Sequence, residues 1–305
     1  LDALCGIAVT GLGHNHPRIT KAIQEQASTL IHCSNLYQIP EQEALATKLC
    51  LLSNMETVFF SNSGAEANEA AIKLARLFGH NKGIEAPVII VAEQSFHGRT
   101  MATLSATGNR KVQAGFEPLL SGFARVPYGD VEAVNQVALN NRNVVAIFIE
   151  PVQGEGGIQI PDPQYLNKLK IITKNQDWLL MVDEVQTGMG RTGAWFAHQH
   201  NDIFPDVMTL AKGLGNGVPI GACLARGKAA EILSPGTHGS TFGGNPLVSR
   251  AALATIDAIE SDSLTDRATF IGNAITEGLR TNFSNEVSIV DIRNKGLMIG
   301  IELDR

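Results

Sequence analysis

A series of short apolar runs constrains the fold of this chain more than any other feature of its sequence. Each run is apolar almost throughout, as strands are when a sheet is covered on both faces. The runs are Val58–Phe60, Val88–Ala92, Val144–Ile149, Trp178–Val182, Val207–Leu210 and Ile220–Leu224. The segments between them are long enough for crossover helices. The sequence therefore predicts an α/β fold with a mainly parallel sheet between layers of helices.

One connecting segment carries a clear helical pattern. Its apolar residues recur at the spacing of one helix face, namely Ala67, Ala70, Ala71, Leu74, Ala75 and Phe78. We expect this helix to stop at Gly79. Similar periodicity over 249–259 and 266–279 predicts helices that lead out of the sheet. The expected division is an N-terminal segment (1–30), a large domain (31–255) and the start of a smaller domain (256–305).

Composition narrows the function classes. The 305 residues carry a net charge of −6, which argues against nucleic acid or an anionic membrane as the main partner. No apolar run approaches the roughly 18 residues that span a bilayer, and the first residues lack the pattern of a signal peptide. The four cysteines have no CxxC spacing, so we expect reduced thiols in a cytoplasmic protein.

The two ends of the sequence favour a piece of a longer protein. The chain begins without methionine and ends at Ile301–Arg305, directly after a strand-like run. We therefore expect the smaller domain to be incomplete.

The turn before the patterned helix is a candidate phosphate site. A strand ends at Phe60, and Ser61-Asn62-Ser63-Gly64-Ala65-Glu66 follows. Free backbone N–H groups and the positive end of the helix dipole then meet at Gly64 and Ala65. A simple helix cap by Ser63 remains an equal alternative. The lysine of a P-loop is missing.

Two carboxylates follow another apolar strand. Asp183 and Glu184 stand at its carboxyl end, where open α/β sheets bind ligands, although acidic residues there are often helix caps. Val185 and Gln186 come next. The GxGxxG spacing of 188–193 starts too far from the strand for a dinucleotide fingerprint, so we interpret it as a loop at the rim of the site.

Lys212 also follows an apolar strand, in Ala211-Lys212-Gly213-Leu214-Gly215. Small neighbours leave room for a flat ring to approach. Removal from water would lower the pKa of its amine and favour the neutral form that imine chemistry requires. Considered alone, a surface lysine in a glycine-rich loop is equally consistent with this pattern.

Two further segments add polar groups. Ser95–Thr100 offers an aromatic face at Phe96 and a cation at Arg99 that suits a carboxylate. His238–Pro246 adds the hydroxyls of Ser240 and Thr241 before a helix. Neither HxH pair of the sequence has partners that complete a metal site, so we expect no metal. A GxSxG elbow is absent, which weakens a hydrolase interpretation.

Taken together, these segments resemble the class III aminotransferases of fold type I, which act on ω-amino groups with pyridoxal phosphate. The resemblance covers essentially the whole chain and is strongest in the acetylornithine group. Its most specific pieces are residues 61–71, 95–100, 182–193, 211–222 and 240–246. It implies a mainly parallel seven-stranded sheet flanked by helices, with a smaller α+β domain.

The resemblance also implies residue roles. Lys212 would be the Schiff-base lysine and Asp183 the partner of the pyridine nitrogen. The remaining cofactor contacts would come from Ser63, Gly64, Ala65, Phe96, Val185, Gln186 and Thr241. Thr241 would reach the cofactor of the neighbouring subunit in a homodimer. Substrate contacts would come from Arg99, Ser240 and the gating acid Glu155.

The reaction so implied transfers an amino group from N2-acetylornithine to 2-oxoglutarate with ping-pong kinetics, as a step of arginine biosynthesis. Succinylornithine, ornithine and 4-aminobutyrate remain alternative donors, because enzymes for them share the lysine and aspartate. An aminomutase that uses the same cofactor is a second alternative. A non-enzymatic binding module is a third, and the intact lysine and aspartate count against it.

Overall fold

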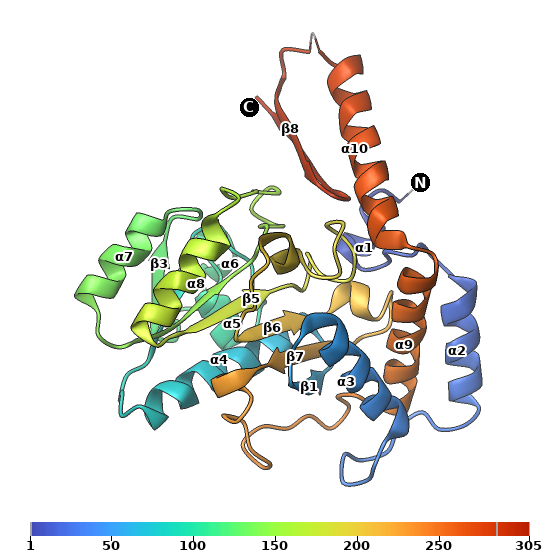
Figure 1. The fold of residues 1–305 in the computed structure, drawn as a ribbon, viewed down its shortest axis with the longest axis horizontal. Helices are drawn as coiled ribbons and strands as arrows, with labels where there is room; N and C mark the ends of the chain where they lie inside the picture. Colours follow the sequence, from blue (N-terminus) through green and yellow to red (C-terminus); the bar gives the residue numbers. More distant parts are fainter. Residues whose placement is uncertain (1, 285, 305) are drawn as a thin grey trace.

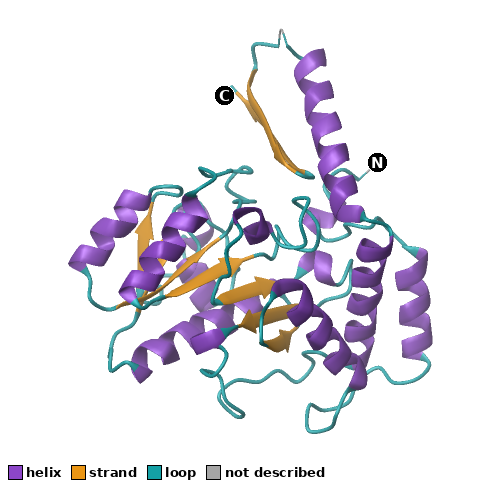
Figure 2. Ribbon diagram, viewed as in Figure 1, coloured by secondary structure: helices purple, strands orange, loops and turns teal. Residues whose placement is uncertain are grey.

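Seven strands form one sheet between layers of helices (Figure 1 and Figure 2). The computed structural model describes residues 2–284 and 286–304, so Leu1 and Arg305, the outer bounds of the expected division, lie outside it. The strands of the sheet are β1 (Thr57–Ser61), β2 (Val88–Ala92), β3 (Phe123–Val126), β4 (Val144–Ile149), β5 (Leu179–Asp183), β6 (Val207–Leu210) and β7 (Gly221–Ala225).

The helices come mostly from the segments between the strands. They are α1 (Cys5–Ala8), α2 (Pro17–Ala27), α3 (Pro40–Ser53), α4 (Gly64–Asn81), α5 (Met101–Ala106), α6 (Arg110–Gln113), α7 (Val131–Asn140), α8 (Tyr165–Gln176), α9 (Pro246–Ser261) and α10 (Leu264–Asn282), with single 3₁₀ turns η1 (Ala197–Asn201), η2 (Lys212–Leu214) and η3 (Gly227–Ala229). Within the described ranges, no helix is long and apolar enough to cross a membrane.

The strand order is β1-β7-β6-β5-β4-β2-β3. Strand β7 pairs antiparallel with both of its neighbours, and every other pair in the sheet is parallel. The expected mainly parallel sheet of seven strands is therefore confirmed. Strand β3 has no counterpart among the apolar runs, because it lies at the edge of the sheet, carries Arg125 and buries only Val126 fully.

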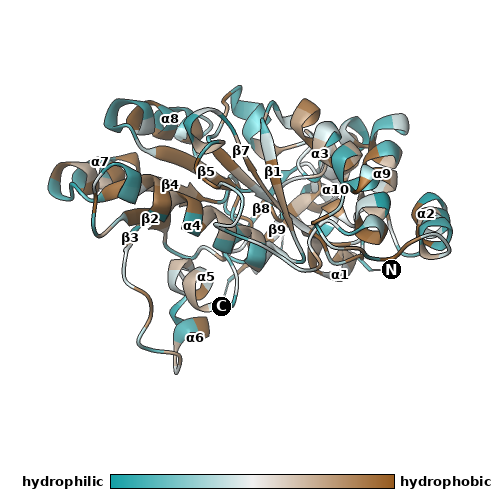
Figure 3. Cartoon of the chain, turned by 90° about the horizontal axis from the view of Figure 1, so that it is seen from below, coloured by the Kyte–Doolittle hydropathy of each residue, from teal (hydrophilic) through white to brown (hydrophobic). Residues whose placement is uncertain are grey.

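Burial on both faces explains why the central strands read as continuous apolar runs. All six residues of β4 are buried. Phe148 belongs to the core under α4, and its neighbours Ile147 and Ile149 belong to the core under α7 and α8. Figure 3 shows these strands as a hydrophobic layer between helices. Each such side chain contributes about 1.5–3 kcal/mol when it leaves water, so a polar substitution on either face is costly.

The sequence predicted that helix α4 ends at Gly79, but the helix continues to Asn81. Gly79 is buried where α4 approaches the sheet. A Cβ there would lie 2.8 Å from side-chain atoms of both Pro87 and Val145. Gly79 therefore allows α4 to pack closely against the sheet. The sequence pattern alone does not distinguish a glycine in this role from one that ends a helix.

This packing predicts that substitution by alanine has opposite effects on stability at two glycines within helices. We expect Gly79→Ala to lower the free energy of unfolding by about 1–2 kcal/mol. The added methyl group overpacks the core, and this cost exceeds the stability gained from the higher helix propensity of alanine. Gly278→Ala in α10 is the matched control, since a Cβ there meets nothing within 4 Å. It should raise the free energy of unfolding by up to about 1 kcal/mol. Urea denaturation of both variants measures the two effects, and equal effects would contradict the packing role.

A hairpin and one helix extend away from the sheet (Figure 1). Strands β8 (Ile289–Lys295) and β9 (Met298–Leu303) pair antiparallel, and α10 packs beside them. Helix α9 continues through residue 256 and ends at Ser261, while α10 begins at Leu264. We propose that the large and small domains divide at this turn rather than inside α9.

Candidate active site

A cavity of about 450 Å³ lies at the carboxyl edge of the sheet. Its size is within the range of cofactor and small-molecule sites. Loops that follow five parallel strands converge on it, as the topology of an open α/β sheet requires. Most of the residues predicted from the sequence line it, namely Ser63, Gly64, Ala65, Phe96, Arg99, Glu155, Asp183, Val185, Gln186 and Lys212.

Ser240 and Thr241 do not line this cavity. They belong to a neighbouring hollow that also includes Asn62 and Glu66. The Asn62 side chain donates to Ser240 Oγ at 3.2 Å and also lines the main cavity, so the two hollows meet at this residue. Thr241 is exposed on the surface of the single chain.

The start of α4 forms an anion cradle. Ser63 is the N-cap residue, and its hydroxyl accepts the backbone N–H of Glu66 at 3.2 Å. Gly64 and Ala65 occupy the first turn, where backbone N–H groups have no intrahelical acceptor. The positive end of an 18-residue helix lies at the same place. A phosphate group fits here without any lysine.

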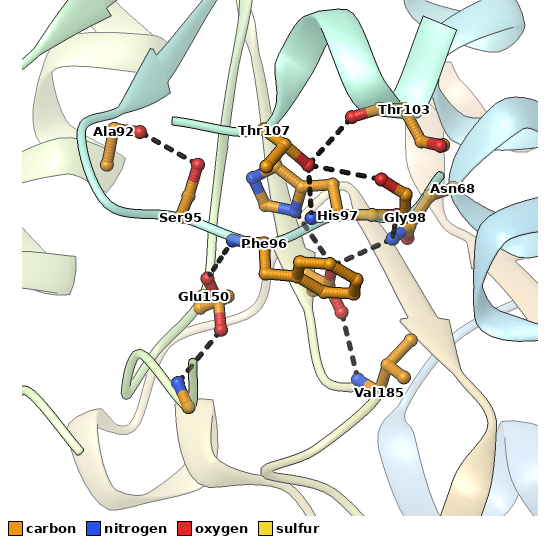
Figure 4. Close-up of polar contacts among 12 residues, drawn as sticks. Asn68, Ala92, Ser95, Phe96, His97, Gly98, Thr103, Thr107, Glu150 and Val185 are labelled. Atoms are coloured by element: carbon orange, nitrogen blue, oxygen red, sulfur yellow. Dashed lines mark hydrogen bonds and ion pairs between the residues drawn. The ribbon is translucent and has the colours of Figure 1, made fainter. Parts of the chain in front are cut away.

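Asp183 stands at the end of β5 with only 3% of its surface exposed. Its Oδ2 accepts N–H groups of Asn68 and of the His97 ring at 2.8 Å each, and its Oδ1 accepts the backbone N–H of Val185 at 3.0 Å. Figure 4 labels the three residues that donate these bonds, Asn68, His97 and Val185. A carboxylate accepts about four hydrogen bonds, so capacity for one more remains toward the cavity.

Glu184, the adjacent carboxylate, faces away from the cavity. It is bonded to the ring and backbone N–H of His198 and to the Thr187 hydroxyl. Burial opposes its ionisation, but the His198 ring and these hydrogen bonds hold its pKa below the ordinary value. The structure thus separates two carboxylates that the sequence presents together, and only Asp183 belongs to the cavity.

Lys212 follows β6 and begins the short turn η2. Its φ of 42° is left-handed, a conformation that costs a non-glycine residue roughly 1–2 kcal/mol. Burial lowers the pKa of its amine, while Asp183, Glu155 and Glu150 oppose that shift by their charge. A larger fraction of the amine is therefore neutral than in an ordinary lysine, as a nucleophilic amine requires.

Three polar residues of the cavity were not singled out from the sequence. Asn68 and His97 are 1% and 2% exposed, and both support Asp183. Glu150 is 6% exposed and follows β4 directly. Glu150 carries the same signal as Asp183, a carboxylate at the carboxyl end of an apolar strand, so the strand pattern already indicated it. Asn68 was detectable as a polar residue within the apolar stripe of α4.

Burial raises the pKa of Glu150 to about 7. The charge of Asp183 raises it further, whereas the His97 ring and two backbone N–H groups act in the opposite direction. Besides Glu155, the cavity therefore holds the Asp183 carboxylate, which accepts three hydrogen bonds, and the Glu150 carboxyl group, which titrates near neutral pH.

The residues present fit pyridoxal phosphate. A Cβ at Gly64 would lie 2.8 Å from Val185 Cγ1, so only glycine leaves the cradle open beside that side chain. Within the described part of the chain, Asn68 Oδ1 and His97 Nε2 are buried without a hydrogen-bond partner. The cavity thus combines a phosphate cradle, a carboxylate, an aromatic ring at Phe96 and an amine at Lys212. No group of three metal-ligating side chains occurs among residues 2–284 and 286–304.

Comparison with known proteins decides the family. The family model described as aminotransferase class III matches residues 1–305. The chain belongs to the class III aminotransferases. An acetylornithine aminotransferase of Nitrosomonas europaea is 64% identical to this class III aminotransferase over 303 residues, which are 99% of the chain and 77% of that relative.

Solved structures agree with this assignment. The ornithine aminotransferase of Toxoplasma gondii, described with partial occupancy of PLP at its active site, superposes on this class III aminotransferase with a TM-score of 0.95 at 35% identity. The match covers 99% of this chain and 72% of that one. The acetylornithine aminotransferase of Elizabethkingia anophelis gives a TM-score of 0.87 at 34% identity, over 99% of this chain and 74% of that one.

Proposed function

We propose that this chain transfers the terminal amino group of N2-acetylornithine to 2-oxoglutarate with pyridoxal phosphate as its cofactor, a step of arginine biosynthesis. The observation that carries this proposal is the 64% identity to an acetylornithine aminotransferase, together with Lys212 and Asp183 in one cavity. Relatives from Bordetella and Mycobacterium with the same name, at 49–53% identity, support the same donor.

The cavity residues predicted from the sequence have distinct roles in this reaction. Gly64, Ala65 and Ser63 would hold the phosphate, Phe96 and Val185 would pack against the ring, and Gln186 would bond the ring hydroxyl. When bound, pyridoxal phosphate supplies an electron sink for the carbanion that the donor leaves on losing a proton. Asp183 would keep a proton on the ring nitrogen, which would preserve that capacity.

Lys212 moves the proton. Burial lowers the pKa of its Nζ, so this amine would take a proton from the donor carbon as a base and return it as an acid on the far side of the transferred nitrogen. Arg99 lines the same cavity, with its guanidinium carbon 5.7 Å from the centroid of the Phe96 ring, and its guanidinium would bind a substrate carboxylate. Glu155, on the loop after β4, lines the same cavity and would act as the gating acid for the two substrates.

A homodimer completes the proposal. The surface beside Thr241 exposes Leu36, Tyr37 and Phe242, of which Leu36 is 90% exposed. The Asn35 side chain donates to the Ser240 and Gly243 carbonyls and so fixes this surface next to the hollow that meets the cavity at Asn62. Pairing of two copies here would bury the apolar side chains and bring Thr241 to the partner's phosphate and Ser240 to the substrate. Light scattering of the purified protein tests the pairing.

The proposed enzyme works in the cytoplasm, where reduced thiols persist. Among the described residues, the four cysteines form no disulfide. Cell fractionation tests this location.

A donor panel tests the function. We expect N2-acetylornithine with 2-oxoglutarate to give glutamate with a kcat/KM at least tenfold above that of succinylornithine, ornithine or 4-aminobutyrate, a margin of about 1.4 kcal/mol. Turnover of a donor without 2-oxoglutarate would instead identify an aminomutase. Absence of turnover with N2-acetylornithine would overturn the proposed donor.

A further inference from the structure

Glu150 is a buried carboxyl group of the cavity to which the proposed function gives no role. It is the first residue after β4, on the same edge of the sheet as Asp183 and Lys212. Its position directly after a central strand restrains its backbone, and the Tyr128 hydroxyl donates to the Glu150 carbonyl at 3.0 Å. The side chain therefore projects from a rigid base.

Its two oxygens bind two different loops (Figure 4). Oε1 accepts the backbone N–H of Phe96 at 2.9 Å, and Oε2 accepts the backbone N–H of Gly154 at 3.0 Å. The first loop carries Phe96, which faces the cavity. The second carries Glu155, which lines the cavity from the other side. One buried side chain thus links both walls.

The bond to Gly154 acts directly on Glu155. The Gly154 carbonyl accepts the N–H of Gly157 at 3.0 Å, so a tight turn begins at Gly154 and presents Glu155 as its second residue. Gln153, one residue earlier, donates to the Glu93 carbonyl at 2.8 Å and ties the same two loops together away from the cavity. Glu150 links the two loops at the cavity itself through its bonds to Phe96 and Gly154.

Only an ionised carboxylate satisfies both N–H groups fully. An amide in its place would turn an NH₂ donor toward one of them, and a neutral carboxyl group accepts more weakly. The titratable groups of the described residues that face Glu150 are the His97 ring, Asp183, Lys212 and the Tyr128 hydroxyl. With its pKa raised to about 7 by burial, the carboxyl group changes charge within the range of an ordinary assay.

We propose that Glu150 is a positioning residue whose carboxylate holds the Phe96 loop and the Glu155 loop against the cavity through these two hydrogen bonds. It acts through residues that touch cofactor and substrate rather than by touching them itself. The inference rests on the proposed function only for the roles of Phe96 and Glu155.

Amide hydrogen exchange of the cofactor-loaded protein tests the two bonds. In Glu150→Gln, the amides of Phe96 and Gly154 should exchange roughly tenfold faster or more, because each loses or weakens a bond to a charged acceptor. Glu93→Gln is the matched control, since Glu93 follows β2 on the same edge and its side chain is exposed. Exchange of both amides within twofold of wild type, or equal loss of protection in the control, would overturn the proposal.

A pH series on the wild type gives a second test that needs no variant. After correction for intrinsic exchange, protection of the Phe96 and Gly154 amides should fall as the pH is lowered from 8 to 6, because Glu150 gains its proton there. In Glu150→Gln the same protection should not change with pH. Constant protection of both wild-type amides over this range would overturn the positioning role, even if the variant fails to fold.

The same variants separate this inference from the proposed function. In Glu150→Gln, kcat should fall about tenfold or more with either substrate pair, while Glu93→Gln keeps its activity. A wild-type chain that is inactive with every donor, yet shows the expected exchange pattern, would refute the function and leave the positioning role intact.

Discussion

Replacing Lys212 with alanine should lower kcat by at least ~10³-fold, the largest single effect expected in this chain. The variant loses the amine that, in the proposed function, both attaches the cofactor and moves the proton. The anion cradle at Gly64 and Ala65 and the Asp183 carboxylate stay in place, because neither is bonded to the lysine. Cofactor binding should therefore weaken without disappearing.

Borohydride reduction followed by peptide mapping checks the attachment directly. Reduced wild-type protein should carry the cofactor on the peptide that contains Lys212, and Lys212→Ala should carry none. Lys111→Ala, which removes an exposed lysine, is the control and should behave as the wild type. A label on any other lysine of the wild type would contradict the assignment of Lys212.

The same lysine should also reduce the stability of the cofactor-free protein. Burial lowers the pKa of Lys212 below the usual 10.5, so the folded state binds fewer protons than the unfolded state between the two values. Stability then rises with pH in that window, and the full penalty applies below it. Cofactor-free Lys212→Met should therefore melt above the wild type near neutral pH, and the difference should shrink as the pH approaches 10.5.

The sheet was largely predictable because burial on both faces leaves an unmistakable pattern. Strands β2, β4 and β6 have the bounds of the apolar runs. The antiparallel direction of β7 could not be predicted, because the apolar sequence pattern of a buried strand is the same in either direction. Edge strand β3 was missed because water covers most of it, so its residues are not selected for burial.

The cavity was predictable only where a residue type is unusual for its place. Lys212 and Asp183 stand out at the ends of apolar strands, whereas His97 and Asn68 act by supporting Asp183 from elements distant in sequence. Such contacts arise from folding and leave no local spacing. Glu184 has the same local sequence signal as Asp183, a carboxylate at the carboxyl end of an apolar strand. Its side chain nevertheless belongs to a buried hydrogen-bond network that faces away from the cavity.

Replacing Asp183 with asparagine should lower kcat by about 10²–10³-fold, because the variant loses the charge that we propose keeps the ring nitrogen protonated. The substitution also disturbs three hydrogen bonds. An amide has one acceptor oxygen, so it cannot replace both Oδ2, which takes the His97 and Asn68 N–H groups, and Oδ1, which takes Val185 N–H. Asp202→Asn, in an exposed left-handed turn that asparagine tolerates, is the control.

The pH profile distinguishes loss of charge from loss of structure. The Asp183 charge raises the pKa of both Lys212 and Glu150, so its removal should move both titrations to lower pH. The acidic limb of the kcat profile in Asp183→Asn should therefore shift toward lower pH than in the wild type. A variant that merely unfolds would lose activity at every pH and melt at a lower temperature. A kcat within tenfold of wild type, with the limb unmoved, would show that Asp183 does not govern the chemistry of this cavity.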